Sequence, residues 1–157
     1  MKLFNNKFVV YSALEKVWAF YTNIRHLEKI TPPEMNLRIL HTTSEEIKEG
    51  AETWITGKII FNMQWHSRIV ALERYRYVDE MFVSGDEKSF FKYWRHEHIF
   101  KAGEGQTLVL DMIKLELPFG LAGRIFEGFA IKRLRNLFKY RETATRKQLE
   151  EGGNLEK

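Results

Sequence analysis

Two histidines at alternate positions of one short stretch are the residues in this sequence best suited to do chemistry. His96 and His98 stand between Trp94 and Phe100, and the four residues are spaced two apart. In an extended strand, residues two apart point to the same face, so both imidazoles would share a face with two large aromatic rings. Aromatic residues at both ends of that face favour an inward orientation. The spacing therefore predicts two histidines turned toward the interior of a sheet.

Two aspartates in the neighbouring expected strands can reach these histidines. Asp79 precedes them in one strand, and Asp111 follows them in the next. Opposite residues of an antiparallel ladder have Cβ atoms about 5 Å apart. An Asp–His–Asp arrangement is therefore geometrically available, but the sequence does not fix the strand register that would form it.

This Asp/His set has three interpretations. It can be a hydrogen-bonded network that braces the sheet and lines part of a cavity, which is the interpretation we favour. It can orient or protonate a bound ligand, as a general acid–base pair does. It can also hold a metal, because a His-x-His pair places two imidazoles side by side. We expect neither a metal nor a cofactor. We expect His26 and His41 at ordinary surface or loop positions, and assign His66 no role.

The longest element that must position these residues is a helix expected over 123–151. Apolar residues recur there at three- and four-residue steps, which places them on one face of a helix. The residues of that face are Leu121, Ile125, Phe129, Leu134, Leu137, Phe138, Arg141 and Ala144. A rod of about 28 residues at ~1.5 Å each spans roughly 40 Å and needs an apolar surface to lie on.

The rest of the chain supplies that surface. Period-two patterns predict strands over 2–10, 37–42, 51–61, 63–74, 76–84, 90–101 and 106–117. Ser12 and Glu15 fit a capping box that starts a first short helix, and a second is expected over 24–30. The third of the six consecutive strands should turn Trp65, Ser67, Ile69 and Ala71 to one side. We predict an α+β fold in which a seven-stranded curved antiparallel sheet wraps around the C-terminal helix.

The bulk composition bounds the class of protein. The 157 residues predict one domain over 1–151 with a disordered tail at 152–157. No stretch approaches 18 consecutive apolar residues, the first residues carry no signal-peptide pattern, and cysteine is absent, so we expect a cytoplasmic protein. The net charge of +4 lies mainly on the last helix. We expect a solvated basic face there and no nucleic-acid partner.

Several motifs along the chain resemble those of one superfamily. They are Val17-Trp18-Ala19-Phe20, the Thr31-Pro32-Pro33 stop, Trp65, Tyr77-Val78-Asp79-Glu80, Trp94 to Phe100, Thr107, Asp111, Leu117-Pro118-Phe119-Gly120 and Phe138-Lys139-Tyr140-Arg141. Together with the element order, they resemble the helix-grip superfamily of START-related lipid-transfer proteins, polyketide cyclases and plant pathogenesis-related allergens. More narrowly, the chain resembles SRPBCC-type ligand-binding proteins, some of which are fused to sugar-nucleotide-epimerase-like domains. The turn at 85–89 departs from the shorter turn of relatives.

This resemblance implies a helix-grip fold with an internal cavity. We therefore expect binding of a small hydrophobic ligand, lipid-like, isoprenoid or aromatic, between the sheet and the last helix. The expected ligand-binding residues are Trp65, Asp79, Trp94, His96, His98, Asp111 and Phe129. Two alternatives remain: a cyclase, dehydratase or hydrolase that uses the same cavity, and a protein-interaction module. A homodimer also remains open.

Overall fold

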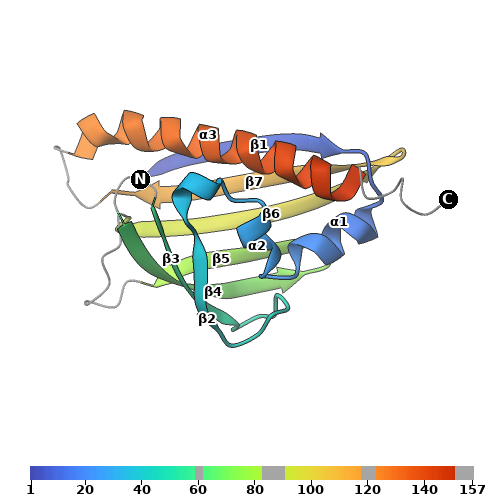
Figure 1. The fold of residues 1–157 in the computed structure, drawn as a ribbon, viewed down its shortest axis with the longest axis horizontal. Coiled ribbons are helices and arrows are strands. Elements are labelled where there is room, and N and C mark those ends of the chain that lie inside the picture. Colours follow the sequence, from blue (N-terminus) through green and yellow to red (C-terminus); the bar gives the residue numbers. More distant parts are fainter. Residues whose placement is uncertain (59–61, 83–90, 118–122, 151–157) are drawn as a thin grey trace.

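Seven antiparallel strands form one curved sheet, and a long helix lies along it (Figure 1). This computed structural model describes residues 1–58, 62–82, 91–117 and 123–150. The strands lie in the order β1-β7-β6-β5-β4-β3-β2. The elements are β1 (Lys2–Val10), α1 (Leu14–Tyr21), α2 (His26–Lys29), the 3₁₀ turn η1 (Pro33–Met35), β2 (Arg38–Thr42), β3 (Glu52–Lys58), β4 (Asn62–Glu73), β5 (Arg76–Phe82), β6 (Tyr93–Gly103), β7 (Gln106–Glu116) and α3 (Gly123–Glu150). The predicted α+β architecture is confirmed.

The strand pattern explains why only one face of the sheet is covered. In β7, Val109, Ile113 and Leu115 are buried, whereas Met112 and Lys114 between them are exposed. This alternation is typical of an antiparallel sheet that packs on one side and meets solvent on the other. The helices α1, α2 and α3 all lie on the same side of the sheet (Figure 1).

Two apolar clusters hold the helices to the sheet. The first packs α3 on the strands and includes Phe4, Ile113, Leu115, Leu134 and Phe138. The second packs α1 and the end of α3 and includes Phe8, Val17, Phe20, Phe100 and Leu149. Full burial of a side chain of this kind contributes about 1.5–3 kcal/mol, so the two clusters dominate the packing energy.

The polar residues of β6 lie between these two clusters. Trp94 packs against the first cluster, and Phe100 belongs to the second. His96 and His98, which separate them along the strand, are buried. The fold therefore places a polar segment in the middle of an apolar interior, where every polar group needs a partner.

The start of α1 differs from the predicted capping box. The residue before the helix is Ala13, and no side chain caps the first turn. A capping box needs its glutamate three residues after the cap, so the box would join positions 13 and 16 rather than Ser12 and Glu15. The Glu15 carboxylate instead accepts hydrogen bonds from Tyr75 Oη and from Arg74 Nη2.

A β-bulge in β4 changes which residues beyond Ile69 share a face with Trp65 and Ser67, in contrast to the prediction. Trp65 and Ser67 line the interior as expected, but the register shifts between Ile69 and Ala71. As a result, Leu72 rather than Ala71 stands opposite the buried Tyr77. The extra residue reverses the alternation beyond it.

Some predictions fall on residues outside the described ranges. These are the end of strand 51–61, the end of strand 76–84, the start of strand 90–101, the turn at 85–89, Leu121 and the tail at 152–157. Among the described helices, none combines the length and the apolar character that a membrane crossing requires.

Candidate functional site

Three adjacent strands bring the two aspartates and the two histidines together. In the β5–β6 ladder Asp79 stands opposite His96, and in the β6–β7 ladder His98 stands opposite Asp111. The sequence predicted this neighbourhood, and the structure supplies the register. His96, His98 and Asp111 are buried, and Asp79 is partly buried.

Each imidazole bonds to the carboxylate diagonal to it rather than to the one opposite. His96 Nε2 lies 3.0 Å from Asp111 Oδ1, and His98 Nε2 lies 3.1 Å from Asp79 Oδ2. The two rings lie against each other, with centroids 3.6 Å apart. The four side chains therefore form one compact unit. Removing one partner would leave another polar group buried without its hydrogen bond, which costs about 1–3 kcal/mol and more where that group is charged.

Each carboxylate is also held on its second oxygen. Ser67 Oγ donates to Asp79 Oδ1 at 3.3 Å, and Asn6 Nδ2 donates to Asp111 Oδ2 at 3.3 Å. Ser67 comes from β4 and Asn6 from β1, so five neighbouring strands contribute to the cluster. This fixes the orientation of both carboxylates.

Burial, and to a lesser extent the neighbouring His96, lower the pKa of His98 to about 4, although Asp79 and Asp111 act in the opposite direction. His98 is therefore neutral near pH 7. Its hydrogen bond to Asp79 assigns the proton to Nε2, so Nδ1 carries a lone pair. Among the described residues, this buried Nδ1 has no hydrogen-bond partner, and Asp111 Oδ1 lies 3.5 Å away. An unpaired buried acceptor is unusual and marks the site for functional scrutiny.

The two aspartates are ionised at neutral pH. Burial raises the pKa of Asp79 and of Asp111, but the hydrogen bonds from His98 and His96, respectively, outweigh this effect together with the charge interactions of both histidines and the hydrogen bonds from Ser67 and Asn6. The net pKa of each carboxyl lies below its ordinary value. Two ionised carboxylates therefore stand in the interior of the protein.

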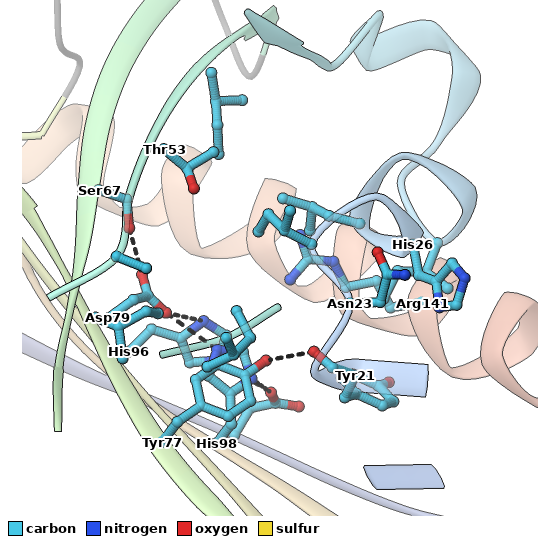
Figure 2. A pocket seen from close by; sticks show the side chains of 18 of the residues that line it. Tyr21, Asn23, His26, Thr53, Ser67, Tyr77, Asp79, His96, His98 and Arg141 are labelled. Carbon is cyan, nitrogen blue, oxygen red and sulfur yellow. Dashed lines mark hydrogen bonds and ion pairs between the residues drawn. The ribbon is translucent and has the colours of Figure 1, made fainter. Parts of the chain in front are cut away.

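A pocket of about 120 Å³ opens above this cluster, between the sheet and the short helices (Figure 2). Its apolar wall is formed by Phe8, Phe20, Ile24, Leu27, Ile30, Ile47, Ala51, Ile55, Trp65, Ile69 and Trp94. Its polar wall is formed by Tyr21, Asn23, His26, Thr53, Ser67, Tyr77, Asp79, His96, His98, Asp111 and Arg141. In Figure 2 the Asp/His cluster lies on the sheet side, and Asn23, His26 and Arg141 lie across from it.

Arg141 is the single residue of α3 that reaches this pocket within the described part of the chain. Its guanidinium carbon lies 5.2 Å from the centre of the Phe138 ring, and its Nε is buried without a hydrogen-bond partner among the described residues. Burial lowers the pKa of Arg141, while the charge of Asp111 raises it. An arginine keeps its charge in proteins, so a cation faces the two carboxylates.

The structure places six of the seven expected ligand-binding residues on the pocket wall. They are Trp65, Asp79, Trp94, His96, His98 and Asp111. Phe129 does not reach it: its side chain is 43% exposed, and Arg133 lies 5.3 Å above its ring. The buried face of α3 runs through Ala130 and Leu134, which are four residues apart. Phe129 is one step of 100° away from Ala130 and therefore points outward.

Other pocket residues escaped sequence reasoning. His26 is not an ordinary loop residue: its ring stacks on Phe20 at 4.4 Å, and its Nδ1 donates to the Phe20 carbonyl at 2.9 Å. Tyr77 stacks on His98 at 4.1 Å.

His41 is exposed, and His66 bonds to Glu52, 2.9 Å away. Arg141 had a signal that could have been used, because a lone cation stands on an otherwise apolar helix face.

Comparisons with known proteins show what the chain is similar to. No protein-family model and no curated protein matches it. A START superfamily protein from Mycobacterium smegmatis has a TM-score of 0.71 at 10% identity, over 95% of this chain and 97% of that one. Norcoclaurine synthase from Thalictrum flavum has a TM-score of 0.71 at 11% identity, over 98% and 96%. A nucleoside-diphosphate sugar epimerase from Corynebacterium glutamicum has a TM-score of 0.63 at 21% identity, over 92% of this chain but 28% of that one. At such identities the likeness shows the fold, and the predicted START-like helix-grip fold is confirmed.

Proposed function

We propose, from this START-like helix-grip fold and the pocket above its sheet, that the protein binds a small, largely apolar molecule. The observation that carries the proposal is the division of the pocket wall into an apolar side and a set of converging polar groups. Such a division is typical of small-molecule sites, where apolar contact supplies affinity and a few polar groups fix orientation. Asp79, His98 and Arg141 would hold the polar end of the ligand.

The size of the pocket supports a ligand part of about one ring. Its volume of about 120 Å³ is close to that of an engineered cavity of roughly 150 Å³ that holds benzene. Norcoclaurine synthase has been crystallised with dopamine and hydroxybenzaldehyde, each of which contains one aromatic ring. That complex belongs to a distant neighbour, but it supports an aromatic ligand as one of the classes to test here.

A second, smaller cavity offers room for a longer ligand. It measures about 40 Å³ and shares Trp65, Trp94 and Arg141 with the main pocket. Its wall includes Leu137 and Phe138 of α3 and is mainly apolar. The shared wall residues place the two spaces side by side, and a lipid-like or isoprenoid tail that reached the second space would lie under α3.

Ligand titration followed by tryptophan fluorescence tests this function, since Trp65 and Trp94 line both spaces. The panel should contain single-ring phenols, fatty acids and isoprenoids, with calorimetry to give stoichiometry. The variant Ala51→Phe adds a ring at the pocket wall and should abolish binding. The variant Phe129→Ala changes an exposed side chain and should bind as the wild type does. Binding that survives Ala51→Phe unchanged would place the ligand elsewhere.

An acid–base enzyme is a second candidate, supported by the unpaired Nδ1 of His98. A neutral imidazole with its proton fixed on Nε2 by Asp79 presents a lone pair that can accept a proton from a bound substrate. The cyclase or dehydratase interpretation would use this group. Turnover of a polyketone substrate that is unchanged in His98→Gln would argue against it.

An interaction module is supported by one comparison only. The C. glutamicum epimerase contains a segment of this fold within a much longer chain. Co-purification of the chain with an epimerase-like protein, retained in Ala51→Phe, would favour this role over ligand binding.

A further inference from the structure

We propose that Asp79, His96 and His98 form a site for a divalent transition-metal ion of the zinc or ferrous class. One donor atom from each of these residues lies within 4.8 Å of the other two. Asp79 Oδ2 lies 3.1 Å from His98 Nε2 and 3.8 Å from His96 Nδ1. This inference does not rest on the binding of an organic ligand.

These distances match the edges of a metal coordination polyhedron. Zinc binds imidazole nitrogen and carboxylate oxygen at about 2.0–2.2 Å. In a tetrahedron with such bonds, neighbouring ligand atoms lie roughly 3.3–3.6 Å apart. The two separations from Asp79 fall on either side of this value. The two edges that meet at Asp79 are therefore each within about half an ångström of the value for a bound ion, and the nitrogens of His96 and His98 lie within 4.8 Å of each other.

The far side of both imidazoles is already arranged as in a metal site. A metal-bound histidine usually donates its other ring N–H to a carboxylate, which fixes the ring and its tautomer. Here the remaining nitrogens, His96 Nε2 and His98 Nδ1, face the same oxygen of Asp111 at 3.0 Å and 3.5 Å. The second oxygens of Asp79 and Asp111 are held by Ser67 and Asn6.

Metal binding would also give His98 Nδ1 a partner. With a metal on Nε2, the proton of a neutral imidazole must sit on Nδ1, where it points toward Asp111. The nitrogen that lacks a hydrogen-bond partner among the described residues would then donate to a carboxylate. The ion replaces the proton that now joins His98 to Asp79.

Charge and access are consistent with a site that keeps one open position. The carboxylates of Asp79 and Asp111 balance the two charges of the ion, while the Arg141 cation across the pocket opposes it. An anionic oxygen in the fourth position, from hydroxide or a ligand, would satisfy both the ion and Arg141. All three residues line the pocket, so a fourth position open to the cavity would make this a site of the catalytic rather than the structural zinc type.

Cobalt titration of the chelator-treated chain tests the site without an organic ligand. We expect one Co²⁺ per chain, visible absorption bands typical of four- or five-coordinate cobalt, and displacement by Zn²⁺. Asp79→Asn and His98→Gln should lose the bands. Asp111→Asn, which alters the carboxylate behind the ring nitrogens, should weaken binding about 10–100-fold. The matched control His66→Gln removes an imidazole that bonds to Glu52, away from the pocket, and should bind normally.

The wild-type protein alone can overturn the proposal, even where a variant fails to fold. A folded wild type, verified by circular dichroism, that takes up no stoichiometric Co²⁺ contradicts it. So does binding that is lost in His66→Gln but kept in Asp79→Asn and His98→Gln. Failure of this test would leave ligand titration by tryptophan fluorescence unaffected, so the two proposals can be judged separately.

Discussion

His98 stands opposite Asp111 in the β6–β7 ladder, yet it bonds to Asp79 on the other side, 3.1 Å away. His96 is paired in the opposite sense, because it bonds to Asp111 rather than to Asp79. This crossed pairing leaves His98 Nδ1 unpaired among the described residues and close to a carboxylate. The protonation states of these four side chains should therefore change with pH and with the binding of a molecule in the pocket.

Stability should fall as the pH drops through the range in which His98 would normally gain a proton. Burial holds its folded pKa at about 4, below the value of about 6.5 in an unfolded chain. At pH values between these two pKa values, His98 is protonated in the unfolded state and neutral in the folded state. Lowering the pH therefore favours unfolding. The expected loss between pH 6.5 and 4 is about 3 kcal/mol. Urea unfolding measured across this range gives the slope.

The variant His98→Gln serves as the control for that slope, because it removes the titrating group and should flatten the curve above pH 4. Below about pH 4, loss should continue in the wild type as Asp79 and Asp111, whose folded pKa values are lowered, gain protons. A wild-type curve that is flat from pH 7 to 4 would show that His98 is not buried in the neutral form.

The register of α3 can be tested with two phenylalanines of the same helix. Phe138 is buried, and its ring centre lies 5.3 Å from that of Phe4 and 5.7 Å from that of His96. Phe138→Ala should lower the free energy of unfolding by about 3–5 kcal/mol through loss of contact and formation of a cavity. Phe129→Ala should change it by less than about 0.5 kcal/mol. Equal effects in denaturant titrations would mean that the helix is rotated from the position described.

Arg141 should select for the charge of the ligand. Its Nε is buried and has no hydrogen-bond partner in the described chain, so an anionic or strongly accepting group is its natural complement. Arg141→Met keeps much of the side-chain volume and should weaken binding of an anionic ligand at least about tenfold. Binding of a neutral analogue should change little. Arg133→Met, on the exposed side of α3, is the control, and loss of both ligands in Arg141→Met would indicate a structural role instead.

Much of the fold was predictable because its signals are periodic. Alternation along Trp94, His96, His98 and Phe100 predicted the inward face of β6, and Lys2–Val10 was predicted with the bounds that the structure shows. The succession of one strand, two short helices, six strands and one long helix followed from such patterns, whereas the pairing of β1 with β7 came from the structure. Each of these signals is local in the sequence, so no tertiary information was needed.

The site was less predictable because its details depend on contacts between distant residues. An apolar stripe on a long helix fits more than one rotation, so Phe129 was placed inward although Ala130 takes that position. The bulge after Ile69 contains no glycine or proline that would indicate it in the sequence. The crossed hydrogen bonds of His96 and His98 depend on register and ring orientation, which residue spacing alone does not determine.

Native mass spectrometry of the purified protein, followed by denaturation and identification of what is released, tests the central claim most directly. We expect wild type to carry one small, largely apolar molecule per chain, or to take one up from a lipid and aromatic extract. Ala51→Phe should carry none under the same conditions. A folded wild type that stays empty after exposure to the extract, or an Ala51→Phe variant that carries the same molecule, would contradict ligand binding in this pocket.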